Sequence, residues 1–80
     1  MAYLKVQYHC AGNEYENIVP FTENEVLIYD RNARIAPWFM NAEFIQDLVA
    51  ERHNSRFYDP SKGGYPFLGE NIIIRTIKLG

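Results

Sequence analysis

Apolar and polar residues alternate strictly from Tyr3 to Cys10, and this limits the folds open to the chain. Successive side chains of a strand point to opposite faces, so the pattern predicts a strand with one buried and one solvated face. The residues expected to be buried are Leu4, Val6, Tyr8 and Cys10. Residues 11–14 contain the glycine and asparagine of a tight turn, and residues 15–21 resume an extended run that Pro20 confines to a sheet edge. The first third of the chain is therefore predicted to be a β-hairpin.

Residues 22–36 carry two conflicting patterns. Thr22 and Glu25 fit a helical capping box, and a helical spacing of apolar residues follows them. The run over residues 26–29, however, is short, continuous and rich in residues that prefer strands, and residues 30–32 resemble a turn. We favour a third strand here, with a helix as the alternative.

Residues 42–53 have the periodicity of an amphipathic helix. Asn41 precedes them as a candidate N-cap, and Arg52 and His53 lie in the last turn, where the helix dipole favours cations. We expect Trp38 to staple the start of this helix to the core. The apolar stripe expected to pack on the sheet consists of Phe44, Ile45, Leu48 and Val49.

The final segment, residues 71–79, is rich in isoleucine. Ile72 and Ile74 would face one way on a regular strand, whereas Ile73, Ile77 and Leu79 would face the other. Apolar residues on both sides predict a central strand. Together, the elements predict an α+β fold for a single domain over residues 1–80: a small antiparallel or mixed sheet of three to four strands, with one amphipathic helix packed on one face.

The composition suits a small cytoplasmic protein. Of the 80 residues, 48% are hydrophobic and 15% aromatic, which is enough for one core without metals or disulfides. Cys10 is the only cysteine, whereas a secreted domain of this size would usually carry several, so we expect a reducing compartment. The N-terminus does not resemble an export signal, and no apolar run is long enough to span a membrane, so no membrane partner is expected.

Residue types that could support catalysis do not form a recognisable motif. His9 and Cys10 are neighbours on a predicted strand and point to opposite faces, so they cannot form a nucleophile–base pair. We interpret Cys10 as a buried thiol and both histidines as surface residues. Residues 61–64 resemble a fragment of a phosphate loop, but they lack its order and its flanking strand and helix. We therefore predict no catalytic residue, no metal ligand and no cofactor.

The segment over residues 54–70 is rich in glycine and proline, and we predict either a short protruding hairpin or an ordered binding loop. Tyrosine and arginine are typical of interface hot spots, and aromatic and basic residues can also stack single-stranded bases. In a third interpretation, Phe57 and Phe67 fold back to cap the core. The predicted partner-binding residues are Arg56, Phe57, Tyr58, Lys62, Tyr65 and Phe67.

These features favour a small non-catalytic binding protein that acts as an inhibitor, adaptor or regulator of a larger protein partner. A phage or mobile-element modulator of a host machine is one form of this hypothesis, although no residue points to it. The first alternative is a nucleic-acid-binding module that uses the aromatic and basic loop, but a net charge of −2 argues against it. The second is a small cysteine- or carboxylate-dependent enzyme. Pairing of copies of the chain stays open.

Overall fold

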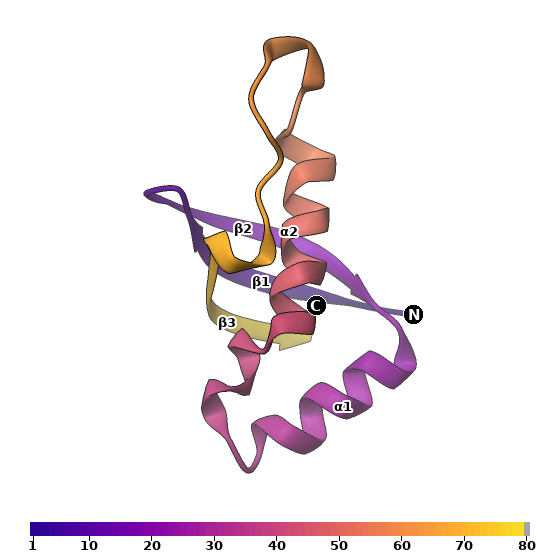
Figure 1. Ribbon diagram of the computed structural model, residues 1–80. Coiled ribbons are helices and arrows are strands. Elements are labelled where there is room, and N and C mark those ends of the chain that lie inside the picture. The colour runs from indigo at the N-terminus through magenta and orange to yellow at the C-terminus, as the bar shows by residue number, and fades with distance from the viewer. Residues whose placement is uncertain (80) are drawn as a thin grey trace.

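The computed structural model describes residues 1–79, which form an α+β fold, as predicted (Figure 1). Three strands make one antiparallel sheet in the order β2-β1-β3. Helix α2 crosses one face of this sheet, and α1 lies beyond it, at the bottom of the view. The elements are β1 (Ala2–Cys10), β2 (Asn13–Phe21), α1 (Glu23–Ala33), α2 (Glu43–Phe57) and β3 (Ile72–Leu79), with 3₁₀ turns over Pro37–Asn41, Pro60–Lys62 and Gly69–Asn71.

The predicted hairpin is confirmed. β1 pairs with β2 from Ala2 opposite Phe21 to Cys10 opposite Asn13. Ala11 and Gly12 join the strands and both have positive φ, as the two-residue turns that match the twist of a hairpin require. The four residues expected to be buried on β1 are buried. β2 is an edge strand, in agreement with its proline.

Residues 23–33 form a helix, so the predicted third strand is wrong. Thr22 Oγ1 accepts a hydrogen bond from the Glu25 amide (3.1 Å), and the Glu25 carboxylate accepts one from the Thr22 amide (2.8 Å). This complete capping box prevails because β preference mostly reflects packing against neighbouring strands and is weak by itself. Val26 and Tyr29 pack half-buried against the core, whereas Leu27 is exposed.

β3 is an edge strand, which corrects the prediction of a central one. Thr76 and Ile74 pair with consecutive residues of β1, so Arg75 is an extra residue and forms a β-bulge. Beyond the bulge the strand changes faces, and Ile77 lies half-buried against the core. Most of the isoleucines therefore share the inner face, and Ile73 is exposed. The side chain of Leu79 lies outside the described part of the chain.

α2 runs one turn past its predicted end at His53. Its N-cap is Ala42, and the predicted cap, Asn41, has another role. The Asn41 side chain accepts a hydrogen bond from the backbone amide of Ile74 (2.7 Å) and donates one to the carbonyl of the same residue (3.1 Å). These bonds fasten the start of α2 to β3.

The buried face of α2 is rotated relative to the predicted stripe. Ile45 and Val49 are fully buried, as predicted, but the other two members of the stripe are only half-buried. Ala50 and His53 complete the buried face instead. The prediction of His53 as a surface residue is therefore wrong.

Trp38 does not staple α2 to the core, because 71% of its surface is exposed. It belongs to the 3₁₀ turn over Pro37–Asn41, which directs Phe39 inward instead. Phe39 packs on Phe44 with ring centroids 5.9 Å apart.

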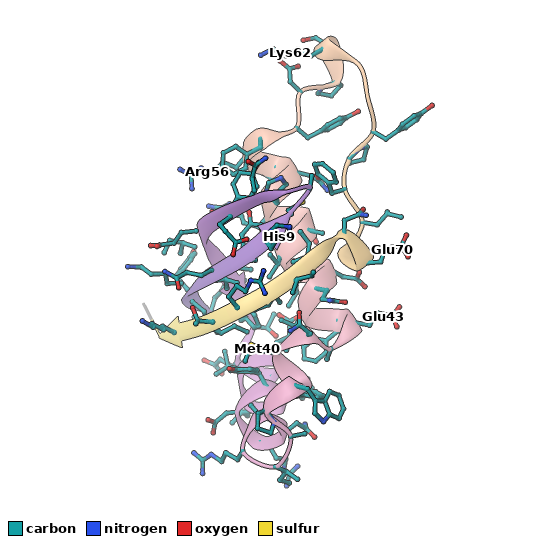
Figure 2. All side chains as sticks on the ribbon, turned by 90° about the vertical axis from the view of Figure 1, so that its left-hand side faces the viewer. His9, Met40, Glu43, Arg56, Lys62 and Glu70 are labelled. Atoms are coloured by element: carbon teal, nitrogen blue, oxygen red, sulfur yellow. The ribbon has the colours of Figure 1, made fainter. Side chains whose placement is uncertain are left out.

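The two faces of the sheet have opposite character. The inner face packs on α2 and holds the core, which includes Tyr8, Phe21 and Ile72. The outer face, toward the viewer in Figure 2, carries polar side chains such as His9. Ion pairs on this face join Lys5 to Glu16 (3.4 Å) and Arg75 to Glu14 (3.1 Å).

Candidate binding site

Residues 58–68 form an arm that projects from the C-terminal end of α2, beyond the sheet (Figure 1). Of the two predicted forms, this is the ordered loop and not the hairpin, because the arm contains a 3₁₀ turn and no strand. Asp59 caps that turn by accepting hydrogen bonds from the amide (3.0 Å) and the hydroxyl (2.7 Å) of Ser61. These bonds lower the pKa of the Asp59 carboxyl.

Hydrogen bonds hold the two sides of the arm together at its base. The Asn54 side chain donates to the carbonyl of Phe67 (2.7 Å) and accepts from its amide (2.9 Å), as a paired strand would. The Tyr58 hydroxyl donates to the carbonyl of Gly64 (3.2 Å). Hydrogen bonds from α2 and from within the arm therefore join its two sides.

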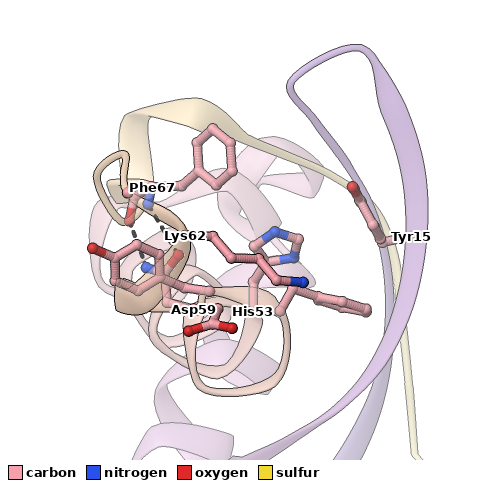
Figure 3. Close-up of a pocket in the computed structure, with 9 residues that line it drawn as sticks. Tyr15, His53, Asp59, Lys62 and Phe67 are labelled. Atoms are coloured by element: carbon pink, nitrogen blue, oxygen red, sulfur yellow. Dashed lines mark hydrogen bonds between the residues drawn. The ribbon is translucent and has the colours of Figure 1, made fainter.

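An open pocket of about 310 Å³ lies where the arm meets α2 and β2 (Figure 3). Its walls are mainly aromatic, and charged side chains stand at its rim. The lining residues are Tyr15, His53, Asn54, Phe57, Tyr58, Asp59, Lys62, Gly63 and Phe67.

His53 forms the floor of this pocket, since it is 3% exposed whereas the aromatic residues around it are more open. Its imidazole lies between Tyr15 and Phe67 (Figure 3), with ring centroids 4.7 and 5.6 Å away. Phe57 lies at 4.9 Å. The sequence signal for this position was its spacing, because residues 45, 49 and 53 recur every four positions along one helix face.

A buried polar cluster lies beneath the pocket. The Tyr8 hydroxyl lies 2.6 Å from Nδ1 of His53. Burial lowers the pKa of His53, which keeps its imidazole neutral near pH 7. Burial also raises the pKa of Tyr8, and the Asn17 side chain opposes this rise. The cluster thus joins a neutral histidine to a protonated tyrosine.

Asn17 occupies the inner face of β2, where the sequence pattern would place an apolar residue, and it is 3% exposed. Its Oδ1 accepts hydrogen bonds from the Ile18 amide (3.0 Å) and from Nη1 of Arg56 (3.4 Å). Its Nδ2 makes no hydrogen bond within residues 1–79.

Of the six predicted partner-binding residues, four line the pocket, whereas Arg56 and Tyr65 do not. Arg56 and Phe57 belong to the last turn of α2, and the Arg56 guanidinium lies 5.1 Å from the Phe57 ring centroid. Tyr65 lies on the arm, is 92% exposed and does not line the pocket. Four of the predicted residues line the pocket together: Phe57, Tyr58, Lys62 and Phe67.

Phe57 and Phe67 fit neither a pure surface nor a pure core interpretation, because they are 47% and 37% exposed. They contact His53 on one side and solvent on the other. Reasoning from the sequence did not name three of the lining residues. Tyr15 is distant in the chain, His53 was assigned to the surface, and Asn54 was placed in the predicted loop, whereas it lies on α2.

The other candidate chemical groups are placed apart from this pocket. Cys10 is fully buried, and burial raises the pKa of its thiol. Over residues 1–79, no three histidine, cysteine or acidic side chains are grouped so that they could hold a metal ion. Nor does this part of the chain contain a helix with the length and apolar character needed to cross a membrane.

Comparison of the chain with models of protein families, with curated proteins and with solved structures found no match. Its function must therefore be inferred from its own residues.

Proposed function

We propose that the chain is a small non-catalytic cytoplasmic protein that binds a larger protein through its arm and acts as an inhibitor, adaptor or regulator. The observation that carries this proposal is the exposure of Tyr65 (92%) and Leu68 (60%) on an ordered projection. Tyrosine gives a large rigid contact area, and hot spots favour it.

The conformation of the arm supports the same proposal. Binding a flexible loop costs about 0.5–1.5 kcal/mol for each side chain that becomes immobilised. Here the hydrogen bonds of Asn54, Tyr58 and Asp59 already hold the arm in place. The entropy cost of ordering the arm therefore belongs to folding and does not weaken partner binding.

A burial argument supports a non-catalytic role. A nucleophilic cysteine needs access to substrate and a lowered pKa, whereas Cys10 is inaccessible and its pKa is raised. The Cys10→Ala variant is therefore expected to retain partner binding. Loss of an activity in folded Cys10→Ala protein would favour the enzyme alternative.

The proposal is tested by titrating the purified partner, once identified, against variants of the arm. Tyr65→Ala is expected to weaken binding by about 1–3 kcal/mol at little cost in stability. The matched control is Tyr3→Ala, because Tyr3 is also exposed (58%) but lies on the outer face of the sheet. Unchanged affinity for folded Tyr65→Ala protein, or equal losses for both variants, would contradict the proposed role of the arm.

Salt separates protein binding from the nucleic-acid alternative. Contacts with phosphates make affinity fall steeply as ionic strength rises, whereas an aromatic protein interface changes much less. The same titrations at low and high salt therefore test both hypotheses. Tight binding of a single-stranded oligonucleotide with a steep salt dependence would favour the nucleic-acid module.

A further inference from the structure

His53 presents one free nitrogen to the pocket. Its Nδ1 faces the Tyr8 hydroxyl, which leaves Nε2 for the pocket side. Nε2 makes no hydrogen bond within residues 1–79. Among these residues, Asn17 Nδ2 is the one fully enclosed side-chain nitrogen or oxygen without a hydrogen-bond partner. Nε2 of His53 is therefore accessible from the pocket. A buried histidine thus keeps an unused polar atom on the floor of an aromatic pocket.

The polar cluster beneath the pocket determines whether this nitrogen carries a proton. A neutral imidazole has one donor and one acceptor nitrogen, so the hydrogen bond between Nδ1 and the Tyr8 hydroxyl leaves Nε2 in whichever role Nδ1 does not take. A hydroxyl group can both donate and accept, so it can hydrogen-bond to Nε2 in either tautomer. The floor of the pocket therefore suits a ligand that carries a hydroxyl group.

The walls and the rim complete the description of the ligand. Tyr15, Phe57 and Phe67 surround the floor, and aromatic rings favour an inserted ring in edge-to-face or offset contact. At the rim, Asp59 is held by Ser61, whereas Lys62 has no ion pair among the described residues. The rim thus carries one charge of each sign, and because Ser61 already donates two hydrogen bonds to the Asp59 carboxylate, the Lys62 ammonium is the charge left to pair with an acidic group of a ligand.

We propose that the pocket is the anchor subsite for a tyrosine side chain of the partner, with an acidic residue beside it in the partner's chain. The ring lies between the aromatic walls, its hydroxyl group hydrogen-bonds to Nε2 of His53, and the neighbouring carboxylate pairs with Lys62. This inference rests on the proposed function, since it names the chemistry that the arm would recognise.

The test uses small probes in place of the unidentified partner. The whole protein, labelled with ¹⁵N, is titrated with 4-hydroxyphenylacetate, which carries a phenol and a carboxylate, while the His53 ring nitrogens and the Phe67 amide are followed by NMR. We expect saturable shifts at both residues, with a dissociation constant on the order of 1 mM. Phenylacetate lacks the hydroxyl and 4-methylphenol lacks the carboxylate, so each should bind about fivefold more weakly.

A matched pair of variants tests the rim. Lys62→Gln should remove the advantage of 4-hydroxyphenylacetate over 4-methylphenol, whereas Lys78→Gln should preserve it, because Lys78 is an exposed cation on β3. The absence of shifts at His53, or equal binding of 4-hydroxyphenylacetate and phenylacetate, would overturn the inference. Tighter binding of adenosine monophosphate than of 4-hydroxyphenylacetate would also overturn it, in favour of a nucleobase.

The two proposals can fail separately. If the probes do not bind but Tyr65→Ala still weakens the partner complex, the tyrosine subsite is wrong and the arm remains the recognition surface. If the probes bind as expected but neither Tyr65→Ala nor Phe67→Ala changes partner affinity, the pocket binds phenols without serving the partner, and the proposed function of the arm is wrong.

Discussion

Replacing Tyr8 with phenylalanine would remove one oxygen from the core and leave its volume almost unchanged. The ring of Tyr8 is fully buried, and its hydroxyl lies 2.6 Å from Nδ1 of His53. The variant loses a hydrogen bond worth about 0.5–1.5 kcal/mol and leaves a buried imidazole nitrogen without a partner, which costs about 1–3 kcal/mol. We therefore expect Tyr8→Phe to lower the free energy of unfolding by about 1–3 kcal/mol.

Urea unfolding at pH 7.5 measures this loss. A domain of this size has a stability of about 4–12 kcal/mol, and its urea dependence is about 1 kcal/mol per molar, so the midpoint should fall by about 1 M or more. Tyr3→Phe is the matched control, because Tyr3 lies on the same strand but is exposed. In a double-mutant cycle with His53→Phe, the two losses should fail to add by about 1 kcal/mol. Equal stability of Tyr8→Phe and Tyr3→Phe would refute the hydrogen-bond assignment.

Three further predictions concern the fold. Gly69→Ala should lower the free energy of unfolding in urea by about 1–3 kcal/mol. The added Cβ would lie 3.0 Å from the backbone nitrogen of Asp47 and still closer to the Asp47 carboxylate. Unchanged stability would mean that this contact is loose. Thr22→Ala should cost about 1 kcal/mol and reduce the helical circular dichroism signal, by breaking the capping box with Glu25, whereas an unchanged signal would show that α1 forms without its cap. Because the pKa of His53 is lowered in the folded protein, the unfolded state binds a proton more readily. The contribution of His53 to stability is therefore complete above about pH 6.5 and declines below that value. The loss is at most about 1.4 kcal/mol at pH 5.5. His53→Phe should remove that part of the pH dependence measured between pH 7.5 and 5.5, and an unchanged slope would contradict it.

The hairpin was predictable because local rules determine it: alternation fixes the faces of β1, and the turn suits the twist of the strands. The position of β3 could not be predicted in this way, because the bulge at Arg75 changes which isoleucines share a face. The spacing of the isoleucines does not show where a bulge occurs. The residues 26–29 satisfied both helix and strand preferences, and the cap at Thr22 decided between them.

The candidate site was predictable only in part. Clustered aromatic residues and turn residues indicated the arm, and four of the six predicted residues line the pocket. Tyr15 and His53 reach the pocket only because β2 and α2 pack together, which is a tertiary event. Asn17 looks like an exposed polar residue in the sequence, yet it is buried on the inner face of β2.

The central position of β1 also constrains the order in which the chain folds. β1 can pair with β2 across a two-residue turn, but its other edge waits for β3, which places Leu79 beside Leu4 after nearly the whole chain has been made. Closing so long a loop is entropically slow, so the hairpin should form early and β3 should dock late. A circular permutant that links residue 79 to residue 1 and opens the chain within the arm would turn this distant pairing into a local hairpin. Such a permutant should refold faster than the original chain, with the same sheet.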